Sequence, residues 1–446
     1  MGGNFTVQNK IRPGAYINFK SNSGNLDLMS SRGTVVIPLE LSWGAEKQVI
    51  EVNKDTDIFK TFGHYITDSE MLLIKEAMKR AIKILVYRVN TGAKATGTDE
   101  TLKVTAKYSG KRGNDIKVTI IEDADNEGYF YINTILEDKV VDTQYINKVA
   151  DIKANEYVEF EAVGDAIAAN EAGIVLSAGA NGEVTNVNYT EDFLNAITPY
   201  EFNTIALPVD TLEIKQAVCN YTKRQRDDEG KKIQAVVADY NTADHEGIIS
   251  VKNGVVLEDG TTLTNVQATV YVAGLTAGSA VNKSNTYEIY DEAIAVPTED
   301  KYTNSQIEEY LQAGHIVFVE KKEKVVIEQD INTLHTFTLE KTKEFSKNRV
   351  MRCLDAIGTD VKEIFENYFI GKISNNEDGR NLFKAQLIKY LNSLTQLEAI
   401  QNFDASTDLE VKAGESIDSV AVELYVQPVD SMEKLYMNVY VEGGNS

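Results

Sequence analysis

The chain has 446 residues, 43% hydrophobic and 25% charged, which is the ordinary balance of a globular protein with two to four domains. Its formal net charge of −23 argues against nucleic-acid binding, which needs a basic surface. No stretch reaches the roughly 18 consecutive apolar residues of a membrane helix, and the N-terminus lacks the features of a secretory signal. We therefore expect no membrane insertion by this chain.

The first 30 residues contain one strand-like segment with no neighbouring strand. It consists of Tyr16, Ile17, Asn18 and Phe19. Pro13 and Gly14 precede it, and a stretch rich in Ser, Asn and Gly follows it. We expect residues 1–30 to form an extended arm.

Residues 31–91 predict the first part of a core domain. Apolar runs at 34–41 and 48–52 indicate strands. A helix beginning near residue 67 follows, and then a strand that ends at residue 89.

From residue 92 to residue 186 the pattern changes to short alternating runs separated by Gly, Asp and Asn, as in an antiparallel β-sandwich or barrel. Because this pattern begins directly after a finished helix–strand unit, we expect an inserted domain, which the resemblance to a known family described below implies to be outward-facing. Its segment 123–128, "DADNEG", begins like a calcium loop, but Thr134 stands where the loop needs a bidentate Glu. We expect a hairpin turn there.

Residues 187–335 alternate strands with helices, which implies a parallel or mixed sheet. Residues 336–430 predict a C-terminal α+β domain: two amphipathic helices and a hairpin. We expect the second helix to bury Leu382, Phe383, Leu387, Leu391 and Leu394. A separate final strand lies in the arm 431–446. The predicted fold class is therefore α/β (α+β) and multidomain, with a mixed-sheet core split by the inserted β-domain.

The sequence shows no catalytic, nucleotide-binding or metal-binding motif, so we expect no enzyme activity, cofactor or metal. We expect the four histidines (His64, His245, His315 and His335) to lie at the surface or to cap other elements. Cys219 and Cys353 should be buried, reduced thiols. The charges around Arg224, "TKRQRDD", should be solvated.

Residues 341–389 carry more basic than acidic residues, in contrast to the rest of the chain. Arg349, Arg352, Arg380, Lys384 and Lys389 would line the polar faces of the two helices. Two interpretations stay open: chance solvation, or an attachment surface for an acidic partner.

Several stretches resemble the sheath protein of contractile phage tails, which also occurs in phage-tail-like bacteriocins. They are "RPGAYINF" at 12–19, "YVAGLTAGSAVNKSNTY" at 271–287, "EQDINTLHTF" at 328–337, "NRVMRCLDAIGTDVKEIFENYFIGKI" at 348–373 and "DGRNLFKAQLIKYLNSL" at 378–394. The resemblance covers nearly the whole chain in the right order, and it is weakest in the inserted domain.

The resemblance implies a structural subunit that polymerises helically around an inner tail tube and contracts from a metastable extended state. It implies further copies of itself, the tube protein, and baseplate and tail terminator proteins as partners. It also implies synthesis in a bacterial host's cytoplasm and residence in a phage tail or tail-like particle. The basic surface would then face the tube.

In the resembling family, terminal arms add strands to a sheet in another subunit. By this resemblance Tyr16–Phe19 is one donated strand. The second comprises Leu435, Tyr436, Met437, Asn438, Val439, Tyr440 and Val441. The receiving hairpin comprises Leu409, Val411, Val420, Val422, Leu424 and Val426. Adding a strand to an open edge pairs the backbone groups of both partners.

Three other interpretations of the sequence stay open. A tail tube protein is usually shorter and mostly β, and a baseplate-associated protein is a further structural tail component. A surface-layer protein or adhesin should carry a signal peptide and fewer helices.

Overall fold

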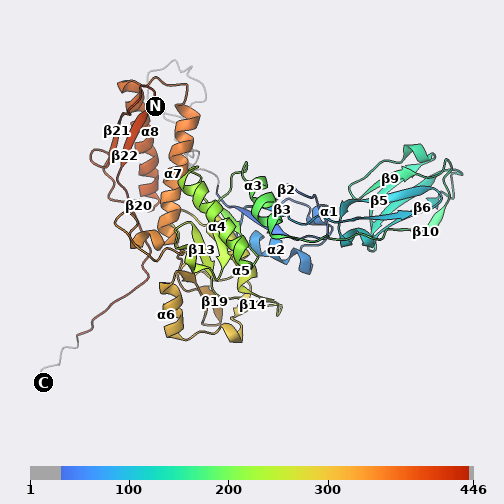
Figure 1. The fold of residues 1–446 in the computed structure, drawn as a ribbon, viewed down its shortest axis with the longest axis horizontal. Coiled ribbons are helices and arrows are strands. Elements are labelled where there is room, and N and C mark those ends of the chain that lie inside the picture. The colour runs from blue at the N-terminus through green and yellow to red at the C-terminus, as the bar shows by residue number, and fades with distance from the viewer. Residues whose placement is uncertain (1–31, 441–446) are drawn as a thin grey trace, which may run out of the picture. The chain divides into compact units, whose positions relative to one another are not determined.

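The structure, a computed structural model, describes residues 32–440. They form two compact units (Figure 1). The larger unit comprises Arg32–Asp355 together with the segment that starts at Asp430, and the smaller unit comprises Ala356–Val429. The predicted N-terminal strand Tyr16–Phe19 and the last predicted arm residue, Val441, lie outside the described residues.

The larger unit is built on a seven-stranded sheet with the order β17-β13-β12-β11-β1-β3-β2. The strands are β1 (Thr34–Leu39), β2 (Val49–Val52), β3 (Lys83–Arg88), β11 (Thr204–Ala206), β12 (Gln234–Ala238), β13 (Ile248–Val251) and β17 (His315–Ile316). All neighbours pair in parallel except β2, which runs antiparallel to β3. The sheet is thus mixed, and it joins strands from both sides of the insertion.

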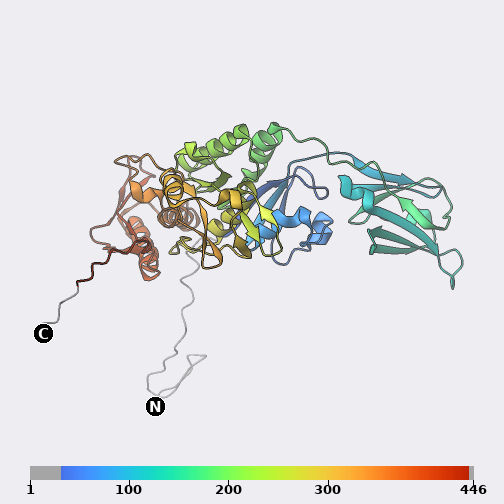
Figure 2. The same ribbon diagram turned by 90° about the horizontal axis from the view of Figure 1, so that it is seen from below.

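Helices cover both faces of this sheet (Figure 2). Alternate residues of β1 point to opposite faces, so Val35 and Ile37 pack with α2 (Leu72–Met78) and α5 (Asn265–Gly278). Val36 packs on the other side with α3 (Leu194–Ile197) and α4 (Leu212–Asp227). Strands buried on both faces explain the continuous apolar runs in the sequence.

Helix α5 was missed in the sequence. Its residues from Ala268 to Ala277 are all buried, so it has no polar face and no amphipathic period. A capping box begins it: the Thr264 side chain accepts from the Gln267 backbone N–H, and the Gln267 side chain accepts from the Thr264 backbone N–H.

The inserted domain is an antiparallel β-sandwich, as predicted. One sheet contains β4 (Lys94–Thr98), β5 (Leu102–Ser109) and β9 (Val158–Ala162); the other contains β6 (Ile116–Glu122), β7 (Phe130–Leu136), β8 (Lys139–Ile146) and β10 (Asn170–Val175). Segment 123–128 is the turn between β6 and β7, so the predicted hairpin is confirmed. The Asp123 side chain accepts from Asp125 N and Asn126 Nδ2, which are bonds within the turn.

The chain enters and leaves the sandwich at one place. Ala93 bridges to Ala180, and Asn90 Nδ2 donates to Asn181 O at 2.8 Å. Glycine permits this approach, because a Cβ on Gly92 would lie 1.9 Å from the Ala180 oxygen. Trp43, which lies between β1 and β2, is buried within the sandwich core and so joins the two domains.

Shorter elements complete the larger unit. They are α1 (Ile58–Phe62), β14 (Val255–Leu257), β15 (Thr262–Leu263), β16 (Ala293–Ala295), α6 (Asn304–Gln312), β18 (Phe318–Lys321) and β19 (Lys324–Ile327).

Helix α7 (Asn348–Tyr368) begins in the larger unit and continues into the smaller one, which also contains α8 (Glu377–Gln396). Its strands are β20 (Ile400–Gln401), β21 (Leu409–Ala413), β22 (Val420–Leu424) and β23 (Gln427–Pro428). Tyr390 on α8 donates to Asp360 Oδ2 on α7 at 2.7 Å. Leu382 was expected to be buried but is 47% exposed, whereas Phe383, one position along, is buried between the helices.

Candidate functional site

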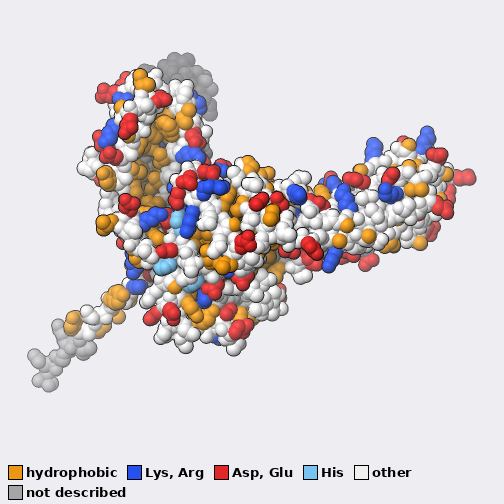
Figure 3. Space-filling model, viewed as in Figure 1, with side chains coloured by type: hydrophobic (Ala, Val, Ile, Leu, Met, Phe, Trp, Pro, Cys, Tyr) orange, Lys and Arg blue, Asp and Glu red, His pale blue; other side chains and the backbone are white. Residues whose placement is uncertain are grey.

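The C-terminal segment is apolar and exposed. Leu435, Tyr436 and Tyr440 are each 86–87% exposed, and Met437 and Val439 are more than 70% exposed. The described part of the segment, 434–440, forms no strand within this chain. Figure 3 shows hydrophobic side chains along it. Such exposure is costly unless another surface covers it, so the segment is a candidate for contact with another chain.

The predicted hairpin exists in the smaller unit. β21 and β22 pair antiparallel, with Leu409 opposite Leu424 and Val411 opposite Val422. Val420 belongs to the same pairing, whereas Val426 lies beyond the end of β22. Among the described residues the sheet has only these two strands, so both outer edges keep unpaired backbone groups.

One of the five basic candidates does not face solvent. Arg352 is 4% exposed; its guanidinium donates to Asp330 Oδ2 and to Lys283 O, each at 2.7 Å. The prediction that Arg352 contributes to a basic surface is therefore wrong, because the folded chain supplies its partner. Lys389 is exposed, and Arg349, Arg380 and Lys384 are half-buried.

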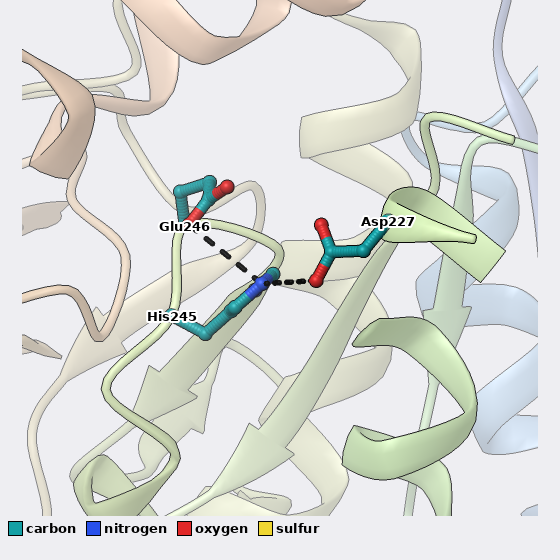
Figure 4. Close-up of side chains that lie close together, drawn as sticks. All are labelled: Asp227, His245 and Glu246. Atoms are coloured by element: carbon teal, nitrogen blue, oxygen red, sulfur yellow. Dashed lines mark ion pairs between the residues drawn. The ribbon is translucent and has the colours of Figure 1, made fainter. Parts of the chain in front are cut away.

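Three side chains with metal-ligating atoms lie together in the larger unit (Figure 4). Asp227 comes from the end of α4, and His245 and Glu246 come from the loop before β13. His245 Nε2 lies 3.6 Å from Asp227 Oδ2 and 3.7 Å from Glu246 Oε2. Among residues 32–440 this is the only such group of three.

The hydrogen bonding of His245 argues against a metal at this cluster. Gly247 N donates to His245 Nδ1 at 2.9 Å, so a neutral ring carries its proton on Nε2. That nitrogen faces the carboxylates, and a metal would need its lone pair. Burial lowers the pKa of His245 and keeps the ring neutral. Lys341 Nζ already neutralises Glu246, at 2.7 and 2.9 Å. We interpret the cluster as structural: a neutral His245 lies beside the Lys341–Glu246 ion pair.

Sequence models of one family match four consecutive parts of the chain. They are the tail sheath protein Gp18 domain III N-terminal region (32–89), the phage tail sheath β-sandwich domain (90–181), the central domain (182–333) and the C-terminal domain (340–442). The solved sheath tail protein of Desulfitobacterium hafniense is 47% identical, with a TM-score of 0.84, over 95% of this chain and 99% of that one. The chain belongs to the phage tail sheath family.

Two other proteins extend this result. The phage-like element PBSX protein XkdK of Bacillus subtilis (strain 168) is 36% identical to this sheath chain, over 99% of each. The helical sheath of the anti-feeding prophage in its contracted state is only 12% identical, with a TM-score of 0.56 over 96% and 98% of the two chains, so it shares the fold. A sheath protein is a structural component of a tail or tail-like particle, as the resemblance implied.

The sequence did not reveal which charges of this sheath protein are structural. Arg226, in the stretch expected to be solvated, is 3% exposed. It forms a bidentate pair with Asp355 at 2.9 and 2.8 Å. The two residues are 129 positions apart, and the local sequence around Arg226 does not indicate that Asp355 is its partner.

Three of the four histidines of the sheath chain were placed wrongly. His64, His245 and His315 are buried, and only His335 is exposed. The two cysteines are buried and free, as predicted. Burial raises the pKa of Cys219 to about 12 and that of Cys353 to about 11, so both thiols are unreactive at neutral pH. Within residues 32–440, no helix has the length and apolar character needed to cross a bilayer.

Proposed function

We propose that this sheath protein polymerises helically around an inner tail tube and contracts from a metastable extended state, driving the tube through a target envelope. Its partners are further copies of itself, the tube protein, and baseplate and tail terminator proteins. Residues 92–186 face outward, and 336–430 face the tube. Arg349, Arg380, Lys384 and Lys389 remain candidates for the tube-facing basic surface.

One observation carries the proposal: the chain contains an exposed apolar segment and an open two-stranded sheet, neither of which is completed within its own described residues. Residues 435–441 have the length and alternation of a strand, with Leu435, Met437 and Val439 on one face and Tyr436 and Tyr440 on the other. A two-stranded ribbon is marginal alone, and an added strand supplies main-chain hydrogen bonds and further burial. Addition of this arm to the hairpin of a second copy covers the apolar side chains of the arm and pairs an open edge of the hairpin.

The N-terminal arm is proposed to act in the same way. Tyr16, Ile17, Asn18 and Phe19 form the second donated strand. Two donated strands would convert the β21–β22 ribbon into a four-stranded sheet shared by three copies, which would join subunits while they move during contraction.

The first test is negative-stain electron microscopy of purified, concentrated protein with and without the tube protein. Wild type should form striated tubes, whereas a deletion of residues 435–446 should remain monomeric. A deletion of residues 442–446, which leaves the donated strand intact, is the matched control and should assemble normally. Tubes from the 435–446 deletion would show that the arm is dispensable.

The same preparation tests the metastable state. Extended sheaths heated in a calorimeter should release heat as they shorten, because contraction would add burial between subunits. Shortening without heat release would contradict that account of the stored energy.

A further inference from the structure

Where the C-terminal arm leaves the larger unit, three donors from the core hold Glu433, and Ser431 Oγ of the arm itself donates to Oε1 at 3.4 Å. The Glu433 side chain is 11% exposed. Oε1 accepts from Thr286 Oγ1 at 2.8 Å, Oε2 accepts from Gln329 Nε2 at 2.8 Å, and Lys347 Nζ forms an ion pair with Oε2. Burial alone would raise the pKa of Glu433, but these three donors outweigh it, so the pKa lies below its usual range. Glu433 is therefore ionised at neutral pH and firmly bound.

Glu433 lies in a cleft of about 1210 Å³ in the larger unit. Its walls come from residues 282–287, 328–337 and 343–347, and residues 430–434 lie along it. The anchor is thus formed by three separate chain segments of the core, each of which supplies one donor.

The same wall of the cleft fixes the start of α7. Gln329 binds Glu433, and the next residue, Asp330, binds Arg352 at 2.7 Å and Asn348 Nδ2 at 2.9 Å. Thr286 links the two sites, because its hydroxyl donates to Glu433 and accepts from the Asp330 backbone N–H at 3.0 Å. Within residues 32–440 the chain passes from the larger unit to the smaller one after Asp355 and returns before Asp430. This wall of the cleft binds both of these chain segments on the side of the larger unit.

The anchoring ends abruptly at Glu433. Leu435, two residues further on, is 86% exposed. Within the described residues, none from 434 to 440 makes a hydrogen bond or ion pair with the rest of the chain. The last residue that is bound to the core therefore lies directly before the proposed donated strand.

We propose that Glu433 is a positioning residue, which ties the root of the C-terminal arm to the core so that residues 435–441 leave it at a fixed point toward a second copy of this chain. This inference rests on the proposed function. The first pairing residue is two residues, or about 7 Å, beyond the anchor. The receiving hairpin of the second copy must therefore come within roughly 10 Å of the cleft.

The anchor itself is tested on the free subunit, without assembly. Glu433→Gln keeps the size of the side chain but removes its charge and places an amide against the Lys347 and Gln329 donors. Trypsin should then cleave after Lys434 about tenfold faster than in wild type, as followed by mass spectrometry. Asp430→Asn removes a charge from the same segment and is the matched control. Among the described residues the Asp430 side chain accepts only from the neighbouring Ser431 N–H, so this variant should be cleaved at the wild-type rate. Equal rates in wild type and Glu433→Gln would overturn the anchor.

The positioning role is tested by the concentration at which tubes form. Glu433→Gln should raise this threshold concentration severalfold and leave the thermal unfolding midpoint unchanged. The charge exchange Lys347→Glu with Glu433→Lys should bring the threshold concentration back toward that of wild type. Faster cleavage with an unchanged threshold would overturn the positioning role and leave the proposed function intact. Wild-type protein that never forms tubes, even with the tube protein, would overturn the proposed function, while the cleavage result still decides the anchor.

Discussion

Two buried ion pairs fix the second turn of α7. Arg352 pairs with Asp330, and Asp355, three residues further on, pairs with Arg226. All four side chains are nearly inaccessible to water. Removal of one member of such a pair leaves an uncompensated buried charge and typically costs about 3–5 kcal/mol. These residues therefore hold the helix where it leaves the core, and none of them is available to an external partner.

His315 gives the larger unit a pH-dependent stability. It is 4% exposed, Nδ1 lies 2.9 Å from Ser250 Oγ, and burial lowers its pKa to about 4 despite the nearby Asp239 carboxylate. Below about pH 6.5 the unfolded chain binds a proton at this site and the folded chain does not, so stability falls as the pH drops toward 4. Full stability is present above pH 6.5, and about 3 kcal/mol is lost across that interval.

A His315→Gln variant should lack this contribution. Its thermal unfolding midpoint should fall less than that of wild type between pH 7 and pH 4.5, because glutamine does not titrate. An equal fall of the unfolding midpoint with pH in the two proteins would show that protonation of the buried ring does not lower the stability.

At the scale of elements, the hairpin is paired within the chain, whereas the described part of the arm is not. The hairpin is defined within the chain, since β21 and β22 pair in one register and Leu409 is buried. The arm has the composition of a strand but makes no strand alone, because a strand needs a partner for its backbone groups. If the proposed strand addition occurs, the arm gains its strand structure only on assembly.

Cysteine cross-linking tests whether the arm pairs with the hairpin. Met437→Cys combined with Val422→Cys, or with its cross-strand neighbour Val411→Cys, should give disulfide-linked multimers under mild oxidation of assembled tubes. The native thiols should not interfere, because both are buried. Tyr436→Cys in place of Met437→Cys puts the thiol on the opposite face of the strand and should cross-link poorly. Equal yields from both faces, or links in unassembled protein, would contradict strand addition.

At the scale of the whole molecule, aromatic packing couples the sandwich to the core, because Trp43 and Phe59 both lie in the hydrophobic cluster of the sandwich. Trp43 is 1% exposed; it packs edge-on against Tyr108 at 5.4 Å and stacks on Tyr157 at 6.4 Å. Arg112 of the sandwich adds a hydrogen bond to Gly63 O at 2.7 Å. A domain held this way should move with the core as one body.

Trp43→Ala should uncouple the two domains. Loss of the indole should cost about 3–5 kcal/mol, and the sandwich should unfold in a separate, earlier calorimetric transition. Trp43→Phe, which keeps an aromatic ring between the two domains, should retain a single unfolding transition whose midpoint shifts less. One unshifted transition in Trp43→Ala would show that the coupling lies elsewhere.

The sequence allowed the architecture to be predicted because most strands and helices carry a local pattern, although the short strands β13 to β16 were not predicted. The insertion was recognised from the change at residue 92, and the hairpin from its alternation. Helix α5 was missed because a helix buried on every side loses its polar stripe. Arg226, Arg352 and the buried histidines were misplaced because their partners are distant in sequence. The role of Glu433 was missed for the same reason, since Thr286, Gln329 and Lys347 are brought to it only by the fold.

The order of strands in the central sheet also determines when each strand can pair during synthesis of the chain. Strand β1 needs β11 beside it, yet β3 ends at residue 88 and β11 begins at residue 204. A ribosome that adds roughly 5–20 residues per second leaves that edge of β1 open for on the order of ten seconds. The sandwich is completed in this interval, and its two ends meet at Ala93 and Ala180. Folding of the insertion in this interval would shorten the loop that must close before β11 reaches β1, which would lower the entropy cost of pairing these two strands.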